Sequence, residues 1–289
     1  MLNNDRIREN EYLEKVRSFL DSECVRLNEL MDAYRNDVRA KGAKFNLDNP
    51  NGGMYSKMEL TELHYEMEKQ MAEIQNAEYE ISFFRNLRKA PYFARIDFKS
   101  DSMKAARPVY LGLRTLQNES TFEMFVCDWR APVASLFYED FEGKAYYDAP
   151  RGRIEGDILL KRQYKFENGE LKYYFDSDLK IDDDILSEVL SQASTDHLKV
   201  IVNSIQRDQN KAIRYTDKTN FLVCGPAGSG KTSVGFHRIA YLLYQNRSNL
   251  SSGEVIMFSN NDIFSSYVAD IIPELGEVPI NYSSFYRIF

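Results

Sequence analysis

The feature that most constrains the fold is a glycine-rich segment placed between an apolar run and an amphipathic run. Residues 225–232 read Gly-Pro-Ala-Gly-Ser-Gly-Lys-Thr and fit the pattern G-x-x-x-x-G-K-[ST] at every fixed position. The preceding run, Phe221–Cys224, is typical of a short buried strand, and Val234–Tyr244 has apolar residues at helical spacing. This order predicts a strand, a phosphate-binding loop and a helix, which is the local unit of a P-loop α/β domain.

The loop predicts a nucleotide site with defined roles. Glycines let successive backbone N–H groups turn towards a phosphate, and the following helix N-terminus adds its positive end. We expect the Lys231 ammonium to reach the β- and γ-phosphates and the Thr232 hydroxyl to ligate Mg²⁺, so these two are the predicted catalytic residues. The predicted binding residues are Gly225, Pro226, Ala227, Gly228, Ser229, Gly230, Lys231 and Thr232. A chance glycine loop is the alternative, and the match in its strand and helix context makes that the weaker interpretation.

Gln209 is a candidate for base recognition. It lies 22 residues before Lys231, on the run into the predicted strand. Its amide can pair with adenine N6 and N7 together, which would select ATP over GTP. Glutamine is also common on solvated helices, so spacing alone supports this role only weakly. The cofactors predicted by these residues are ATP and Mg²⁺.

Residues 1–90 have the pattern of two long helices. Residues 5–42 contain no proline, and apolar side chains recur there in steps of three and four at Leu13, Val16, Leu20, Cys24, Leu27, Met31, Tyr34 and Val38. A cluster of helix breakers at 44–53 is expected to end the first helix. A second series follows at Leu60, Leu63, Met67, Met71, Ile74, Ile81 and Phe84. Each helix would be about 50 Å long. We interpret the pair as an antiparallel coiled-coil arm; two helices of an ordinary bundle are the alternative.

From Pro91 to about residue 180 the chain is rich in aromatic and β-branched residues with turn signals, among them Asn168-Gly169. This predicts a small, mainly antiparallel β module, with no Ser/His/Asp spacing or metal-ligand cluster in its sequence. The pentad Asp128-Trp129-Arg130-Ala131-Pro132 is expected to place a buried Trp beside an Asp–Arg pair where a strand meets a turn.

Residues 181–289 are predicted to form a helical lead-in and the beginning of a RecA-like P-loop domain. Asp182–Asp184 open this range, and they suit either a helix N-terminus or a divalent cation. The predicted fold class is therefore α+β multidomain, with a helical arm at 1–90, a β module at 91–180 and an incomplete α/β domain at 181–289.

Composition excludes several classes of protein. With 44 acidic against 37 basic side chains, a net charge of -7 argues against whole-surface attraction to nucleic acid, although a local basic groove stays open. Cys24, Cys127 and Cys224 form neither a disulfide framework nor a zinc pattern and suit a reducing compartment. The polar N-terminal segment is no secretory signal, and no apolar run approaches the ~18 residues of a membrane span. We therefore expect a cytoplasmic protein without membrane contacts.

Several segments resemble a known family. Gln209–Ile213, the loop 225–232 and the helix 237–244 are similar to the Q-motif and Walker A region of superfamily 1 helicases of the UvrD/Rep type. Residues 254–261 resemble the next strand with motif Ia, and 279–289 the approach to motif Ib. Within that superfamily, 128–139, 201–214, 270–280 and the N-terminal arm resemble the HelD, or helicase IV-like, group. Many relatives carry Arg directly after the P-loop Thr; because Ser233 stands here, no nucleotide contact is carried over to that position.

The resemblance implies a role in transcription. Proteins of the HelD group act on RNA polymerase: the arm probes the secondary channel, and ATP-driven motion releases nucleic acid and recycles the polymerase core. The arm tip, 43–53, would then approach the polymerase active site. Asp48 is the only acidic residue in that tip, so metal chelation there is not expected. The alternatives are a DNA helicase or translocase in repair or replication, with DNA as a partner of the intact protein, and a binding module without activity.

Hydrolysis needs groups that the sequence does not supply. A superfamily 1 ATPase requires an acidic Walker B pair and an arginine from a second lobe. After Thr232 no Asp-Glu pair follows an apolar run. We expect the chain to be the N-terminal part of a longer motor that, alone, binds nucleotide weakly and does not hydrolyse it.

Overall fold

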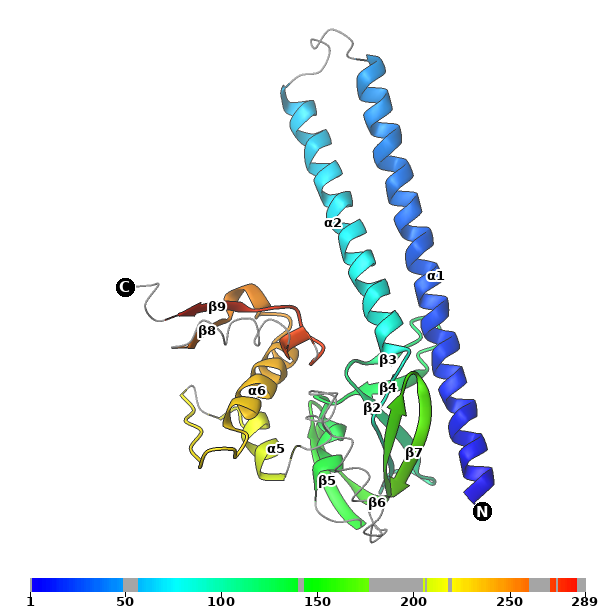
Figure 1. Cartoon of the computed structure of the whole chain (residues 1–289), viewed down its shortest axis with the longest axis vertical. Coiled ribbons are helices and arrows are strands. Elements are labelled where there is room, and N and C mark those ends of the chain that lie inside the picture. Colours follow the sequence, from blue (N-terminus) through cyan, green and yellow to red (C-terminus); the bar gives the residue numbers. More distant parts are fainter. Residues whose placement is uncertain are drawn as a thin grey trace. The chain divides into compact units, whose positions relative to one another are not determined.

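The protein folds into two compact units in the computed structural model (Figure 1). The structure describes residues 2–48, 57–139, 143–176, 205, 207–217, 220–259, 271–273 and 275–284. One unit comprises residues 1–91 with the turn 166–171, and the other comprises 92–165 and 172–289. The fold is α+β, as predicted, with an N-terminal helical region and a mixed β-sheet module.

The helical unit is an antiparallel hairpin of α1 (Leu2–Asp48) and α2 (Lys57–Leu87) (Figure 1). Two ion pairs join the helices, between Arg35 and Glu78 at 2.7 Å and between Lys41 and Glu66 at 2.8 Å, and a third joins Asp21 of α1 to Arg88, just after α2, at 2.8 Å. From one pair to the next along α1, the residue number rises on the α1 side and falls on the α2 side. This order fixes the antiparallel register.

The apolar seam of the hairpin is narrow. Leu27, Met31, Ala77 and Ile81 are buried together, and Cys24, Ile74 and Phe84 pack against them. Leu60 and Met71, which the helical spacing placed on the same face, are 38% and 54% exposed. Two helices cover only the side chains of one seam between them, so a wider predicted face stays partly in solvent.

The first helix is longer than predicted. It continues to Asp48, five residues into the segment 44–53 that was expected to end it. Residues 44–48 contain neither glycine nor proline, so nothing in them breaks the helical hydrogen bonds. Pro50 restricts Asn49 before it, and these two begin the stretch 49–56 that lies outside the described residues.

The second unit contains a seven-stranded sheet with the order β3-β4-β2-β1-β6-β5, and β7 also pairs with β6. Its strands are β1 (Ala94–Ser100), β2 (Arg107–Gly112), β3 (Leu116–Gln117), β4 (Met124–Asp128), β5 (Gly143–Ala149), β6 (Gly152–Glu167) and β7 (Glu170–Asp176). The pairs β1–β2, β1–β6, β5–β6 and β3–β4 are antiparallel, whereas β2–β4 is parallel. The sheet is therefore mainly antiparallel, as predicted, but mixed.

The Asn-Gly turn forms where the sequence predicted it. Asn168 and Gly169 have φ of 51° and 82° between β6 and β7, the two left-handed positions of a type I′ hairpin. At the end of β4 the chain enters the 3-10 helix η1 (Pro132–Tyr138), which starts with proline at a position that needs no N–H donor.

The P-loop region adds α5 (Arg207–Arg214), α6 (Lys231–Gln245), the 3-10 helix η2 (Ser252–Glu254) and the parallel strands β8 (Ile256–Ser259) and β9 (Asn281–Ser284). The prediction of a strand at Phe221–Cys224 is wrong, since these residues lie in no strand or helix. Leu222 is 84% exposed there. A parallel strand is stabilised by neighbours on both sides, and no ladder reaches this run among the described residues.

One hydrophobic core joins the β module to the P-loop region. Ile96, Leu111, Trp129 and Leu136 of the former belong to the same buried cluster as Ile213, Phe236 and Ala240 of the latter. The three-part division at 90 and 180 stays a prediction, and Asp182–Asp184 lie outside the described residues. Among the helices that the structure describes, none is long and apolar enough to cross a bilayer.

Candidate nucleotide site and the loop that supports it

The loop 225–232 has the backbone that its glycines predict. Gly228 and Gly230 have φ of 80° and 77°, a left-handed region that side chains with a Cβ rarely adopt. The Pro226 carbonyl accepts a hydrogen bond from the Ser229 N–H at 3.3 Å and another from the Lys231 ammonium at 2.6 Å. The Lys231 side chain is therefore folded back over the loop.

The loop ends at the N-terminus of α6. Gly230 is the N-cap and has no side chain to accept a hydrogen bond from the first turn. The Val234 N–H bonds to the Gly230 carbonyl at 2.8 Å, as the first intrahelical bond. Because the earlier N–H groups have no side-chain cap, they and the helix dipole favour an anion at this point. Thr232 is exposed beside them.

Gln209 lies against this loop. Its Nε2 donates to the Ser229 carbonyl at 3.3 Å, across 20 positions in sequence. A Cβ added to Gly230 would come within 2.8 Å of the same Nε2, which is the movable end of the Gln209 side chain, so it is the φ of Gly230 that requires glycine. The structure thus brings together Gln209 and the loop, which the sequence predicted as parts of one site.

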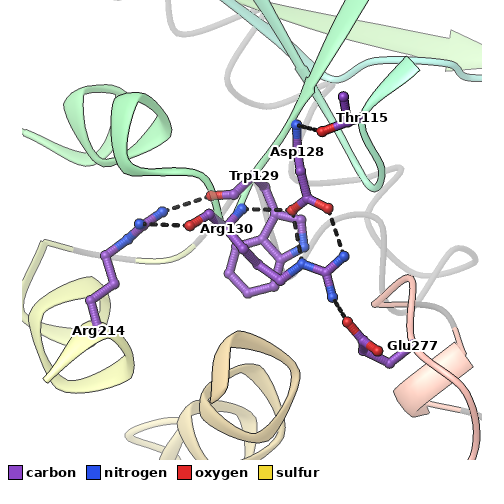
Figure 2. A network of polar contacts seen from close by, with 6 residues as sticks. All are labelled: Thr115, Asp128, Trp129, Arg130, Arg214 and Glu277. Carbon is purple, nitrogen blue, oxygen red and sulfur yellow. Dashed lines mark hydrogen bonds and ion pairs between the residues drawn. The ribbon is translucent and has the colours of Figure 1, made fainter. Parts of the chain in front are cut away.

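A second polar cluster lies at the end of β4, in residues 128–131, which we call the DWR loop (Figure 2). Asp128 accepts the Arg130 N–H at 2.8 Å and pairs with its guanidinium at 2.6 Å. Both side chains are almost fully buried, and Arg130 also pairs with Glu277. Trp129 is completely buried, which confirms the predicted Trp beside an Asp–Arg pair.

Burial and pairing act in opposite directions on these charges. Desolvation alone would lower the pKa of Arg130, but its hydrogen bonds and charge interaction with Asp128 outweigh it and raise that pKa. Desolvation raises the pKa of Glu277, against the opposing effect of Arg130. Gly276, with φ of 90°, permits the approach of this segment, because a Cβ there would meet the Leu113 carbonyl at 2.7 Å.

The DWR loop is bound by Arg214 at the end of α5 (Figure 2). The guanidinium donates to the Trp129 carbonyl at 2.6 Å, the Arg130 carbonyl at 3.1 Å and the Ala131 carbonyl at 3.2 Å. Its Nε bonds to Asn210 Oδ1 at 2.9 Å, one turn earlier in the helix. Arg214 therefore joins the same short helix that carries Gln209 to the DWR loop.

The P-loop helix α6 also contacts the DWR loop. The imidazole of His237 meets the Trp129 ring edge-on, with centroids 5.4 Å apart. His237 Nδ1 lies 2.7 Å from the Ser233 carbonyl, and burial lowers the pKa of this histidine. Within the described structure, His237 Nε2 and Trp129 Nε1 are buried without a hydrogen-bond partner.

The residues around the loop fit a nucleotide with a divalent cation. The uncapped N–H groups and Lys231 suit phosphates, and the exposed Thr232 hydroxyl suits a cation that the phosphates also hold. No cluster of three or more His, Cys, Asp or Glu side chains that could bind a metal alone occurs in the described part of the chain. The sequence did not reveal that Arg214, His237 and Glu277 meet at the DWR loop; the conspicuous pentad 128–132 was the one signal.

Two family models match the chain. The N-terminal domain of DNA helicase IV HelD matches residues 7–193, and the UvrD/REP helicase N-terminal domain matches residues 205–261. No curated protein matches it. The first match contains the DWR loop, and the second contains Gln209, the P-loop and α6.

Proposed function

The chain belongs to the family of the N-terminal domain of DNA helicase IV HelD, and we propose that it binds ATP with Mg²⁺ as part of an ATP-dependent superfamily 1 motor. The family model covers more than half of the chain. The match to the UvrD/REP helicase N-terminal domain makes the chain a UvrD-like helicase-family member and implies an ATPase in the intact protein. The site residues and the partner below are our proposals.

The observation that carries the nucleotide proposal is the uncapped N-terminus of α6 beside Lys231. The backbone N–H groups of residues 225 and 227–230 would surround the phosphates, and the Lys231 ammonium would leave the Pro226 carbonyl to bind the β- and γ-phosphates. Thr232 would hold Mg²⁺ through its hydroxyl. Gln209 would read the adenine edge from beside Gly230.

Nucleotide binding is tested on the complete 289-residue chain with a fluorescent ATP analogue and Mg²⁺. We expect saturable binding that Lys231→Ala weakens by at least about tenfold, because a charge-assisted contact to phosphate is lost. Lys104→Ala is the matched control, since Lys104 is exposed and distant in sequence from the loop. Equal binding by Lys231→Ala and the unaltered chain would contradict the site.

We propose that this chain alone does not turn over ATP. Bound Mg²⁺ and the attacking water need an acidic pair, and no Asp-Glu pair follows an apolar run after Thr232. Phosphate release should stay at the level of the Lys231→Ala variant. Steady release that this substitution abolishes would contradict the proposal.

The proposed partner is the core of RNA polymerase, bound through the α1–α2 hairpin. A long hairpin with mostly polar outer surfaces has no evident use in moving along DNA. Its shape suits insertion into a channel of another protein. In the intact protein, ATP binding and hydrolysis would then release nucleic acid and recycle the polymerase. A cytoplasmic location follows from such a partner.

A pull-down on polymerase core without DNA tests this partner. Retention of the unaltered chain and loss of retention on deletion of residues 5–88 are expected. The emission of Trp129 should stay unchanged in the deletion variant, to show that the second unit is folded. Retention by the deletion variant would exclude the role of the hairpin.

A DNA helicase or translocase of the UvrD/Rep type is the second candidate. The match over 205–261 favours it, because that model describes the N-terminal domain of UvrD/REP helicases. Binding to DNA in the absence of polymerase, with no retention on polymerase core, would favour this function over the first.

A further inference from the structure

The short helix α5 is attached at two places to different parts of the second unit. Near its start, Gln209 donates to the Ser229 carbonyl of the P-loop at 3.3 Å. At its end, Arg214 donates to the carbonyls of Trp129, Arg130 and Ala131. The two residues are five positions apart, which is about 7.5 Å along a helix. A shift of α5 relative to the DWR loop would therefore move Gln209 relative to the P-loop by a similar amount.

The hydrogen bonds of Arg214 fix the orientation of its guanidinium relative to the DWR loop. A guanidinium has five N–H donors in a rigid fork, and here the fork is used on three successive carbonyls of one loop and on Asn210. The loop itself is held in place, because Asp128 accepts the backbone N–H and the side chain of Arg130. Because the guanidinium is rigid and the DWR loop is held in place, these hydrogen bonds allow only one position of α5 along the loop.

A second arginine also binds the end of α5. Arg238 of α6 donates to the carbonyls of Ala212 at 2.9 Å and Ile213 at 3.2 Å. These are orphan carbonyls of the α5 C-terminus, where a cation is favoured. The end of α5 is thus bound to both the DWR loop and the P-loop helix, and Gln209 lies near the opposite end of the same helix, at the P-loop.

We propose that Arg214 is a positioning residue for base recognition: by binding the carbonyls of the DWR loop it holds α5 in the register that keeps Gln209 at the P-loop. This inference rests on the proposed nucleotide function of residues 225–232. In this proposal Arg214 contacts neither the base nor the phosphates of the nucleotide. Its loss should reduce discrimination between adenine and guanine nucleotides, while binding of the phosphates, which depends on Lys231 and the α6 N-terminus, is retained.

The chain contains its own reporter of this contact. Trp129 is the only tryptophan, it is completely buried, and its carbonyl accepts the shortest of the Arg214 hydrogen bonds. Its ring also contacts His237 of α6. Because Arg214 connects α5 to the Trp129 carbonyl, an adenine nucleotide held by Gln209 should change the surroundings of Trp129 and with them its emission.

The experiment compares ATP and GTP analogues on the complete chain with Mg²⁺. Four variants are used: Arg214→Met removes the donors and keeps the length, Arg214→Lys keeps the charge, Gln209→Ala removes the proposed reader, and Lys211→Met is the matched control. Lys211 is exposed on the same helix and lies 3.7 Å from Asp208. Binding constants and the ligand-induced change in Trp129 emission are measured for each.

We expect the unaltered chain and Lys211→Met to prefer ATP by about tenfold, the effect of one good base contact. Arg214→Met and Gln209→Ala should lose most of that preference, with GTP affinity changed less than about twofold, and Arg214→Lys should recover part of it. The emission change on ATP binding should be lost in Arg214→Met. An unchanged ATP-to-GTP ratio in a folded Arg214→Met would overturn the inference.

The remaining outcomes are also decisive. If Arg214→Met exposes Trp129 and does not fold, Arg214→Lys takes its place, and a ratio equal to that of the unaltered chain would overturn the inference. If the unaltered chain binds both analogues equally, the reading role of Gln209 fails and the positioning role fails with it. If it binds neither, the proposed nucleotide site itself is wrong. That result differs from an unaltered chain that prefers ATP and keeps the preference in Arg214→Met, which would overturn only the positioning role.

Discussion

The helical hairpin and the DWR loop use the same arginine–carboxylate pair in opposite environments. Arg35 and Glu78 join α1 to α2 at 2.7 Å with side chains 40% and 54% exposed. Arg130 and Asp128 are 2.6 Å apart and 3% and 2% exposed. An exposed pair gains little, because water screens it and ordering two long side chains costs entropy. A buried pair has already lost its hydration, so each charge depends on the other. Distance alone therefore says little about what a pair contributes.

Replacement of Arg130 by Met should have the largest effect on this comparison. Asp128 would remain buried without its main ion-pair partner, so we expect the free energy of unfolding to fall by about 3–5 kcal/mol. Urea denaturation followed by Trp129 emission measures the loss in the second unit. The control is the same substitution at Arg35. A loss below about 1 kcal/mol at Arg130 would mean that Asp128 finds water or another cation.

A change of pH should have a smaller effect on the free energy of unfolding, through the buried His237, and the exposed His64 serves for comparison. Burial lowers the pKa of His237 below its usual 6.5, against the hydrogen bond to the Ser233 carbonyl. Above about pH 7 both folded and unfolded chains hold the imidazole neutral, and as the pH falls the unfolded chain takes up the proton first. The free energy of unfolding should therefore decrease as pH falls from about 7.5 to about 5.5.

Two variants isolate the histidine. His237→Phe should reduce this decrease, whereas His64→Ala should leave it, because His64 on α2 is exposed beside Glu68. Urea titrations of each variant at both ends of the pH range give the comparison. The same pH dependence in His237→Phe and the unaltered chain would assign the effect to other groups.

The smallest effect should come from Arg35→Met. Loss of the exposed pair with Glu78 should lower the free energy of unfolding by less than about 1 kcal/mol, and even that should disappear in about 1 M salt. Helix ellipticity at increasing temperature, at low and high salt, measures it. A salt-independent loss similar to that of Arg130→Met would remove the contrast between the two environments.

The sequence predicted those features that short-range patterns determine. The Asn168-Gly169 turn follows from residues that tolerate left-handed backbone, and α6 follows from apolar spacing after a glycine loop. The buried Trp129 with its Asp–Arg pair was also predicted. In each case the neighbours that decide the structure lie within a few positions of one another.

Features that depend on distant partners were not predictable in the same way. Arg214 reaches carbonyls 83 to 85 positions away, and Glu277 reaches Arg130 across 147 positions. Nothing near Arg214 in sequence marks it out from other arginines on solvated helices. The failed strand at Phe221–Cys224 has the same cause, because an apolar run is a strand only when another strand pairs with it. In α1 the cluster of helix breakers at 44–53 does contain the end of the helix, as predicted, but the helix continues to Asp48, the last residue before Asn49 and Pro50.

The turn 166–171 has a consequence for how the protein can be divided. It belongs to the helical unit, and Arg17 of α1 donates to its Gly169 carbonyl. The chain therefore passes between the two units three times, after residues 91, 165 and 171. Residues 2–91 have a single covalent link to the rest of the chain, whereas the turn 166–171 is held to them by non-covalent contacts such as that of Arg17 with Gly169. Proteolysis between residues 91 and 92 alone should leave both fragments associated on a sizing column.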